Sequence, residues 1–283
     1  MSKIAIVTDS TANLPRKWVE QYQVYVVPLK VNWGDETYRD GVDITVDEFY
    51  KKLAKSKVLP TTSQPSVLDF LHAFESAAEQ ADAIIAPLIS SGISGTVATA
   101  QLARSEFTRI PVEIVDTRIT SMGQVLIILA IARALEQGKS IQEVKQLAEH
   151  IARRLHTYFA VDTLDYLHRG GRINTASRYL GTLLAVKPIL YFNEEGKIDA
   201  LERVRTSRKA LQRLLELAEE HAAGQPVHVG IVHADAADVA REFQAEVESR
   251  LNCKEIFTVE CSPNIAVHVG PGTIGIALYN EIG

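Results

Sequence analysis

The side chains best placed for chemistry follow an apolar run, residues 83–88 (AIIAPL), that has the length of a strand. The run opens into the loop Ile89-Ser-Ser-Gly-Ile-Ser-Gly-Thr96, and a helical pattern begins at Val97. Backbone N–H groups and the positive end of the helix dipole meet at such a junction, which therefore favours an anion. The loop carries the hydroxyl groups of Ser90, Ser91, Ser94 and Thr96. It has no lysine of the P-loop kind, so the pattern suits a carboxylate better than a triphosphate, and an ordinary capped strand-to-helix turn is the alternative.

A second loop rich in hydroxyl groups precedes the helix expected over residues 67–79. It contains Thr61, Thr62, Ser63 and Gln64. Pro60 and Pro65 enclose these residues and restrict the backbone, so the donors keep fixed directions at a low entropic cost. Ser66 is a suitable N-cap for the helix, and that role explains the loop equally well without a ligand.

Strands alternate with helices as far as about residue 155, which predicts a parallel sheet covered by helices on both faces. The strands expected in this half are residues 3–7, 24–31, 83–88 and 111–116. Beyond it we expect a helix over residues 175–184, a hairpin over residues 187–204 and then an α+β arrangement. The sequence thus predicts an α/β protein of two domains, residues 1–155 and residues 156–283.

Asp9 and Ser10 follow the first strand at its carboxyl end, where ligands gather in open α/β sheets. The two residues would also cap the helix expected over residues 14–21, so both roles stay open. Farther along, Thr45 and Glu48 have the spacing of a capping box and predict a helix that runs to Leu53.

Composition is that of an ordinary globular protein, with 46% hydrophobic and 23% charged residues in 283. The net charge of −5 disfavours nucleic acid as the main partner. Cys253 and Cys261 lack metal-ligand spacing and are expected to be reduced thiols. The longest apolar run, residues 125–132, is too short to span a bilayer, and the N-terminus does not have the plan of a signal peptide. We therefore expect a cytoplasmic protein without stable membrane insertion.

Local matches to catalytic motifs fail on their context. Gly270-Pro-Gly-Thr-Ile-Gly275 fits the dinucleotide fingerprint, but too little chain follows it for the required βαβ unit. Gly92-Ile-Ser-Gly95 is one residue short of a nucleophile elbow. The sequence has no zinc-site or P-loop spacing, so no cofactor and no metal are expected. His268, beside a Gly-Pro-Gly turn, is either a structural histidine or a polar contact to a ligand.

Several short segments, in one order along the whole chain, match the motifs of a known family. They are residues Val7–Ala12, Thr61–Ser66, Ile89–Thr96, Val115–Thr117, Val161–Ile173, Lys187–Leu190 and His268–Gly272. On these residues the chain resembles the DegV family of bacterial fatty-acid-binding proteins. The resemblance implies one long-chain fatty acid in a tunnel between an α/β domain and a smaller α+β domain.

The resemblance also implies roles for individual residues. Thr62, Ser94 and His268 would hold the fatty-acid carboxylate. Their neighbours at the site would be Thr61, Ser63, Gly95 and Thr96. Arg172, in the Gly-Gly-Arg motif, would face a partner or close the head-group end. Some members of the family present the fatty acid to a separate ATP-binding subunit of a fatty-acid kinase, so this chain would be a carrier and not an enzyme. Gly123-Gln124-Val125 departs from an expected Gly-x-Gly and is expected to alter packing near the tunnel.

The chemistry of the residues agrees with a fatty acid. A buried carboxylate needs several donors, and each buried CH₂ of a tail contributes about 0.8 kcal/mol. The alternative is an autonomous acyl hydrolase or transferase that uses Ser94 and His268 on a small carboxylate or ester. A phosphoryl-transfer protein built on the Ser/Gly loop is a third hypothesis, which the missing lysine disfavours.

Overall fold

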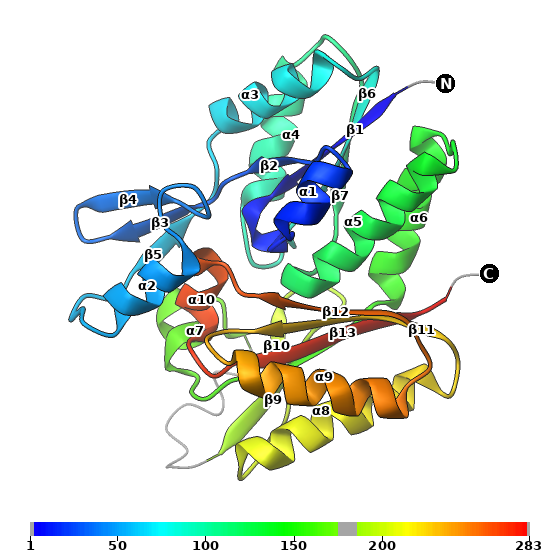
Figure 1. Ribbon diagram of the computed structural model, residues 1–283. Helices are drawn as coiled ribbons and strands as arrows, with labels where there is room; N and C mark the ends of the chain where they lie inside the picture. The colour runs from blue at the N-terminus through cyan, green and yellow to red at the C-terminus, as the bar shows by residue number, and fades with distance from the viewer. Residues whose placement is uncertain (1–2, 175–185, 282–283) are drawn as a thin grey trace.

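The structure, a computed structural model, describes residues 3–174 and 186–281. The N-terminal half forms a parallel sheet with the strand order β2-β1-β6-β7 (Figure 1). Its strands are β1 (Ile4–Asp9), β2 (Tyr25–Val27), β6 (Ala83–Leu88) and β7 (Val112–Asp116). The helices on its two faces are α3 (Val67–Ala78) and α4 (Thr96–Glu106) on one, and α5 (Ser121–Glu136) and α6 (Ile141–Arg154) on the other. The predicted α/β architecture is confirmed.

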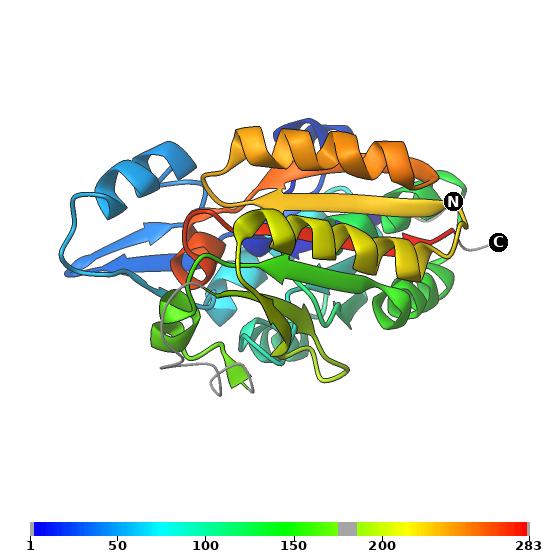
Figure 2. The same cartoon turned by 90° about the horizontal axis from the view of Figure 1, so that it is seen from below.

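The C-terminal half forms a mixed sheet with the strand order β10-β9-β8-β13-β11-β12. Its strands are β8 (His156–Ala160), β9 (Lys187–Phe192), β10 (Ile198–Val204), β11 (Val227–His233), β12 (Cys253–Glu260) and β13 (Ile274–Asn280). The helices on its outer face are α8 (Ser207–Ala222) and α9 (Ala237–Arg250) (Figure 2). Helix α5 packs against the inner face and also against the parallel sheet, so it lies between the two sheets. That position explains why residues 125–132 are apolar on every side.

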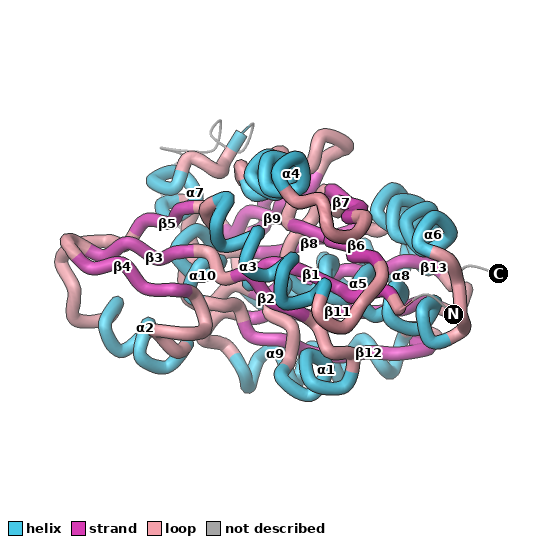
Figure 3. The backbone as a smooth tube through the Cα atoms, turned by 90° about the horizontal axis from the view of Figure 1, so that it is seen from above, coloured by secondary structure: helices cyan, strands magenta, loops and turns pink. Residues whose placement is uncertain are grey.

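A small antiparallel sheet projects beside the parallel one (Figures 1 and 3). It has the order β4-β3-β5 and consists of β3 (Lys30–Trp33), β4 (Glu36–Arg39) and β5 (Thr61–Ser63), with α2 (Val46–Leu53) between β4 and β5. The prediction of a single strand over residues 24–31 is wrong. The chain leaves β2 at Pro28, which has no N–H for a sheet, and enters β3 in a different sheet. The predicted loop before α3 likewise contains a strand, β5.

Two helix starts that the sequence predicted from capping residues are confirmed. Thr45 and Glu48 form a complete capping box at α2, and the Ser66 side chain caps α3. Asp9, however, caps the short 3₁₀ helix η1 (Ser10–Ala12), and α1 (Arg16–Gln21) begins only after it. Asn13 between them has φ of 55°, a left-handed conformation that prevents one continuous helix.

Two short helices, α7 (Asp165–Gly170) and α10 (Pro263–Val269), pack against each other at the end of the mixed sheet. Helix α10 was not predicted, because its Gly-Pro-Gly neighbourhood resembles a turn; its Pro at the first position and Gly after the last are ordinary helix boundaries. The predicted helix over residues 175–184 lies outside the described residues, and the domain boundary at residue 155 stays a prediction. Within residues 3–174 and 186–281 no helix is long and apolar enough to cross a membrane.

Candidate ligand-binding site

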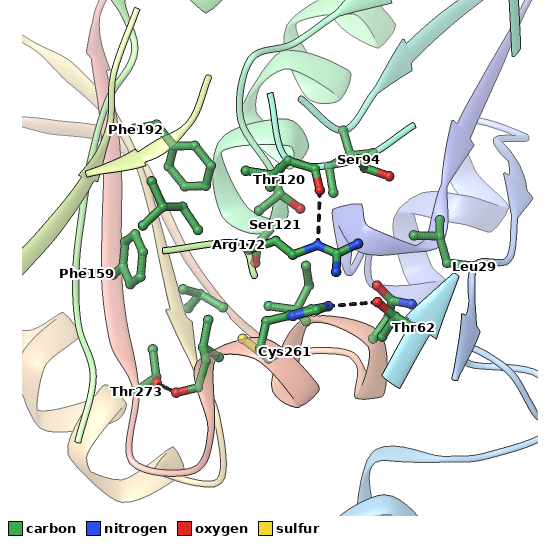
Figure 4. A pocket seen from close by; sticks show the side chains of 18 of the residues that line it. Leu29, Thr62, Ser94, Thr120, Ser121, Phe159, Arg172, Phe192, Cys261 and Thr273 are labelled. Atoms are coloured by element: carbon green, nitrogen blue, oxygen red, sulfur yellow. Dashed lines mark hydrogen bonds between the residues drawn. The ribbon is translucent and has the colours of Figure 1, made fainter. Parts of the chain in front are cut away.

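A cavity lies between the small sheet, the start of α5 and the inner face of the mixed sheet (Figure 4). About 830 Å³ of space in and around it is free of protein atoms, counting the part of its mouth that is open to solvent. Its larger apolar side chains are those of Leu29, Ile89, Ile93, Met122, Phe159, Phe192, Ile198, Val232, Ile265 and Val269. We call the part formed by Thr62, Ser94, Arg172 and His268 the polar end. The part around Phe159 and Phe192, across the cavity from Thr62, is the apolar end.

A hydrogen bond of 2.7 Å between Thr62 Oγ1 and His268 Nε2 holds the polar end together (Figure 4). Thr62 lies on β5, and its ladder to β3 pairs it with Val31. His268 lies in the last turn of α10, which contacts both β3 and β5. The fold therefore brings together two predicted site residues that are far apart in the sequence.

His268 is neutral at ordinary pH. Burial in the protein and, as the smaller cause, the positive charge of Arg172 together lower its pKa to about 3. Its Nδ1 atom is buried and has no hydrogen-bond partner among the described residues. Gly170 packs so closely on the ring that a Cβ there would lie 2.2 Å from Nδ1. A ring that donates from Nε2 to Thr62 leaves the Thr62 hydroxyl free to donate to a ligand anion.

Ser94 reaches the polar end from the loop that precedes α4. Its Oγ lies 2.8 Å from Thr96 Oγ1 and accepts a hydrogen bond from the Thr96 N–H group. Gly95, the N-cap of α4, has no side-chain cap and packs on the side chain of Gln64; a Cβ at residue 95 would lie 2.0 Å from Gln64 Oε1. Only glycine allows this approach, which places Gln64 and Ser94 on the same wall of the cavity.

Arg172 supplies a positive charge at the polar end. It follows Gly171, whose φ of +68° turns the chain at the end of α7. Its guanidinium donates to the backbone carbonyls of Ile93, at 3.3 Å, and Gly170, at 2.6 Å. No carboxylate of the described residues forms an ion pair with it. The charge is therefore available to an anionic ligand or partner.

The structure separates the hydroxyl groups that the sequence grouped around one anion. Ser90 is fully buried and donates to a backbone carbonyl of the β9–β10 hairpin, and Ser91 donates to Asp116. Thr96 is fully buried, while Thr61 is exposed; neither lines the cavity. The convergence of all these groups is therefore a wrong expectation, because successive residues of a tight turn point in different directions. Ser63, in contrast, lines the cavity beside Thr62.

Asp9 and Ser10 also lie outside the cavity wall. Asp9 is fully buried, where it accepts hydrogen bonds from the Ile89 N–H group and the Gln124 amide, and its burial raises its pKa. Val125, where the family resemblance led us to expect glycine, is buried in the core and does not line the cavity either.

Sequence reasoning missed much of the cavity wall. The missed residues include Thr120, Ser121, Met122, Thr157, Phe159, Phe192, Cys261 and Asn264. Thr157 and Phe159 alternate along β8, and a period of two could have marked them. In α5 the apolar residues 125–132 show no period that would mark one face, and the cavity-lining residues Ser121 and Met122 lie at its start. In the described parts of the chain, no group of three or more His, Cys, Asp or Glu side chains is arranged to hold a metal ion.

Comparison with known sequences identifies relatives along the whole chain. Residues 3–281 match the family described as "Uncharacterised protein, DegV family". Protein DegV of Bacillus subtilis is 36% identical over 276 residues, which cover 96% of this chain and 98% of the relative. A DegV domain-containing protein of Halalkalibacterium halodurans is 38% identical over 283 residues, covering 99% of this chain and 100% of the relative.

Solved structures share the fold. A DegV family protein from Thermus thermophilus, described by its fatty acid binding, superposes with a TM-score of 0.92 at 37% identity, over 99% of this chain and 100% of that one. DegV from Bacillus subtilis, described as a fatty acid binding protein, superposes with a TM-score of 0.91 at 34% identity, over 99% of this chain and 100% of that one. A stearic-acid-binding protein from Eubacterium ventriosum superposes with a TM-score of 0.89 at 29% identity, over 99% of this chain and 98% of that one.

Proposed function

The chain belongs to the DegV family, and we propose that it binds one long-chain fatty acid, with the carboxylate at the polar end and the hydrocarbon chain along the cavity. The single observation behind this proposal is a cavity that joins Thr62, Ser94 and His268 at one end to aromatic and aliphatic walls over the rest. Fatty acid binding by the relatives from Thermus thermophilus and Bacillus subtilis supports it.

The energetics of such a ligand suit the two ends. A carboxylate leaves water at a high cost unless charge-assisted hydrogen bonds replace its hydration. Thr62 and Ser94 offer hydroxyl donors, and Arg172 offers a guanidinium without an anionic partner in the described parts of the chain. Each CH₂ buried against the apolar walls adds about 0.8 kcal/mol before the cost of binding.

We further propose that the chain presents the carboxylate to a separate fatty-acid kinase subunit. In that reaction a carboxylate oxygen attacks the γ-phosphorus of a nucleoside triphosphate held by the partner. The bond to the β–γ bridging oxygen breaks, the nucleoside diphosphate leaves, and an acyl phosphate remains. Arg172 borders both the cavity and two outer depressions, so it stands where the carboxylate would meet that partner.

The geometry does not support the alternative, an autonomous Ser/His acyl hydrolase or transferase. Nucleophilic catalysis needs a hydroxyl bonded to its general base. Ser94 Oγ is bonded to Thr96, and the Nε2 atom of His268 is bonded to Thr62. The nucleophile and the base are therefore not paired with each other.

Native mass spectrometry of the purified protein, followed by organic extraction, tests the proposal. We expect an adduct that extracts as one fatty acid per chain. Thr62→Val should lower the affinity for added fatty acid by about tenfold or more, because the hydrogen bond from the Thr62 hydroxyl to the charged carboxylate is lost. Thr61→Val is the matched control, since its hydroxyl is exposed outside the cavity. A protein that stays empty when offered acids of several chain lengths would refute the proposal.

A further inference from the structure

The hydroxyl group of Thr157 differs from every other hydroxyl group on the cavity wall. The others each have at least one hydrogen bond within the protein: Thr62, Ser63, Ser94, Thr120, Ser121 and Thr273. Thr157 is 5% exposed, and its Oγ1 has no hydrogen-bond partner among the described residues. Buried hydroxyl groups are normally bonded, so this one calls for a partner that the protein itself does not supply.

The surroundings of Thr157 are apolar. Phe159 lies two residues along β8 on the same face, and the register of β8 with β9 puts Phe192 beside Thr157 on the neighbouring strand. On the other side β13 pairs Ala277 with Thr157. Valine has the shape of threonine and would fill this position without the desolvation penalty of an unmade hydrogen bond. A hydroxyl is therefore favourable here only when something in the cavity bonds to it.

Thr157 is far from the polar end along the strand. The carboxyl end of β8 leads through Val161 to α7 and then to Arg172. Thr157 precedes Val161 by four residues, which is roughly 13 Å of extended strand. A fatty acid bound with its carboxylate at the polar end would thus reach Thr157 with the distal part of its chain.

We propose that Thr157 is a specificity-determining residue that selects acyl chains with an oxygen-bearing substituent, a hydroxyl group, in their distal half. This inference rests on the proposed fatty-acid site and goes beyond it, because it names the chemical class of the preferred chain. The Thr157 hydroxyl can donate to such a substituent or accept from it. A plain hydrocarbon chain leaves the hydrogen-bonding capacity of the Thr157 hydroxyl unused. A buried water on Thr157 is the competing explanation.

Competition binding with stearate, 12-hydroxystearate and 2-hydroxystearate tests the proposal on the full chain. We expect the 12-hydroxy acid to bind about fivefold or more tightly than stearate, which corresponds to one ordinary hydrogen bond. The 2-hydroxy acid should show no such gain, because its hydroxyl stays near the polar end. Thr157→Val should reduce the preference ratio to about one, and Thr157→Ser, which keeps the hydroxyl, should retain it.

The control is Ile198→Val, which removes a methylene from the same cavity and should change the affinities for both acids by the same factor. Equal affinity of the wild type for stearate and 12-hydroxystearate would overturn the inference and leave the fatty-acid site standing; this is also the result expected for a bound water. A preference that persists in Thr157→Val would overturn it as well. Failure of all three acids to bind would refute the proposed function and the inference together.

Discussion

The two ends of the cavity are built in different ways. The polar end combines side chains from four separate places: a short strand, the loop before α4, the end of α7 and the last turn of α10. The apolar end comes mainly from neighbouring strands of the mixed sheet, β8 and β9. The polar end therefore depends on several segments keeping their relative positions, whereas the apolar end depends on one sheet. We expect the first to fix the head group and the second to set the preferred chain.

The largest loss of fatty-acid affinity should come from a substitution at the polar end, and this loss should be the same for every chain length. On the proposed binding mode, Ser94→Ala removes a donor to the carboxylate, so affinity should fall by about 30-fold for decanoate and stearate alike. Isothermal titration calorimetry with both acids measures it. Ser91→Ala is the matched control, because its hydroxyl bonds Asp116 and not the cavity. A loss that grows with chain length would mean that Ser94 acts through packing.

A change at the apolar end should, in contrast, depend on chain length. Phe192→Trp enlarges a side chain that points into the cavity from β9 (Figure 4). If the indole displaces two methylene groups of a long chain, stearate should lose about 15-fold in affinity. Decanoate, which leaves this part of the cavity empty, should lose little. The same titrations provide the measurement, and equal losses for both acids would contradict the division into two ends.

Much of the fold could be predicted because it depends on local signals. Apolar runs of strand length alternating with capped helices indicated the parallel sheet, and the Thr45–Glu48 pair and the N-cap residue Ser66 indicated two helix starts. The errors occur where tertiary pairing decides. Nothing local shows that β3 leaves the sheet of the strand before it to pair with β5, which follows about 30 residues later in the chain.

The site could be predicted in part. Thr62, Ser94 and His268 were named from the family resemblance, and the structure brings all three to one cavity. Ser90 and Thr96 have the same chemistry as Ser94 and the same loop, yet they are buried away from the cavity. Residue type and spacing do not specify which side of a turn a hydroxyl faces, since that depends on the backbone dihedral angles of the folded loop.

A smaller effect concerns Asp40, which anchors the helix that carries His268. Asp40 is 2% exposed; its carboxylate accepts hydrogen bonds from the Ser10 hydroxyl, at 2.7 Å, and from the Asn264 N–H group of α10, at 3.1 Å. Burial raises its pKa to about 6. A raised carboxyl pKa stabilises the folded state below the unfolded pKa of 3.8, and that contribution is lost as pH rises through 6.

Asp40→Asn cannot ionise, so it should be more stable than the wild type at pH 8 and equally or less stable near pH 4. The loss of the Ser10 hydrogen bond partly offsets this stabilisation, so the free energy of unfolding should be about 1–2 kcal/mol higher than that of the wild type at pH 8. Urea unfolding at both pH values measures it. Asp43→Asn is the control, because contacts with Arg39 lower the pKa of Asp43 to about 2 and its removal should give no gain at pH 8. A less stable Asp40→Asn protein at pH 8 would show that the hydrogen bonds outweigh the desolvation.

The smallest expected effect is the response of ligand binding to pH. A histidine that became positive near pH 6 would attract the carboxylate and tighten binding as pH falls. His268 has a pKa of about 3, so it stays neutral, and affinity for stearate should change by less than about twofold between pH 8 and pH 6. The lowered pKa of His268 affects the stability of the fold instead. Below about pH 6.5 the histidine takes up a proton in the unfolded chain but not in the folded protein, so the free energy of unfolding decreases as pH falls below 6.5. Titrations at the two pH values, with His268→Gln as the reference, separate the two cases. Binding that tightens fivefold in the wild type and not in the variant would mean that the imidazole ionises beside the carboxylate.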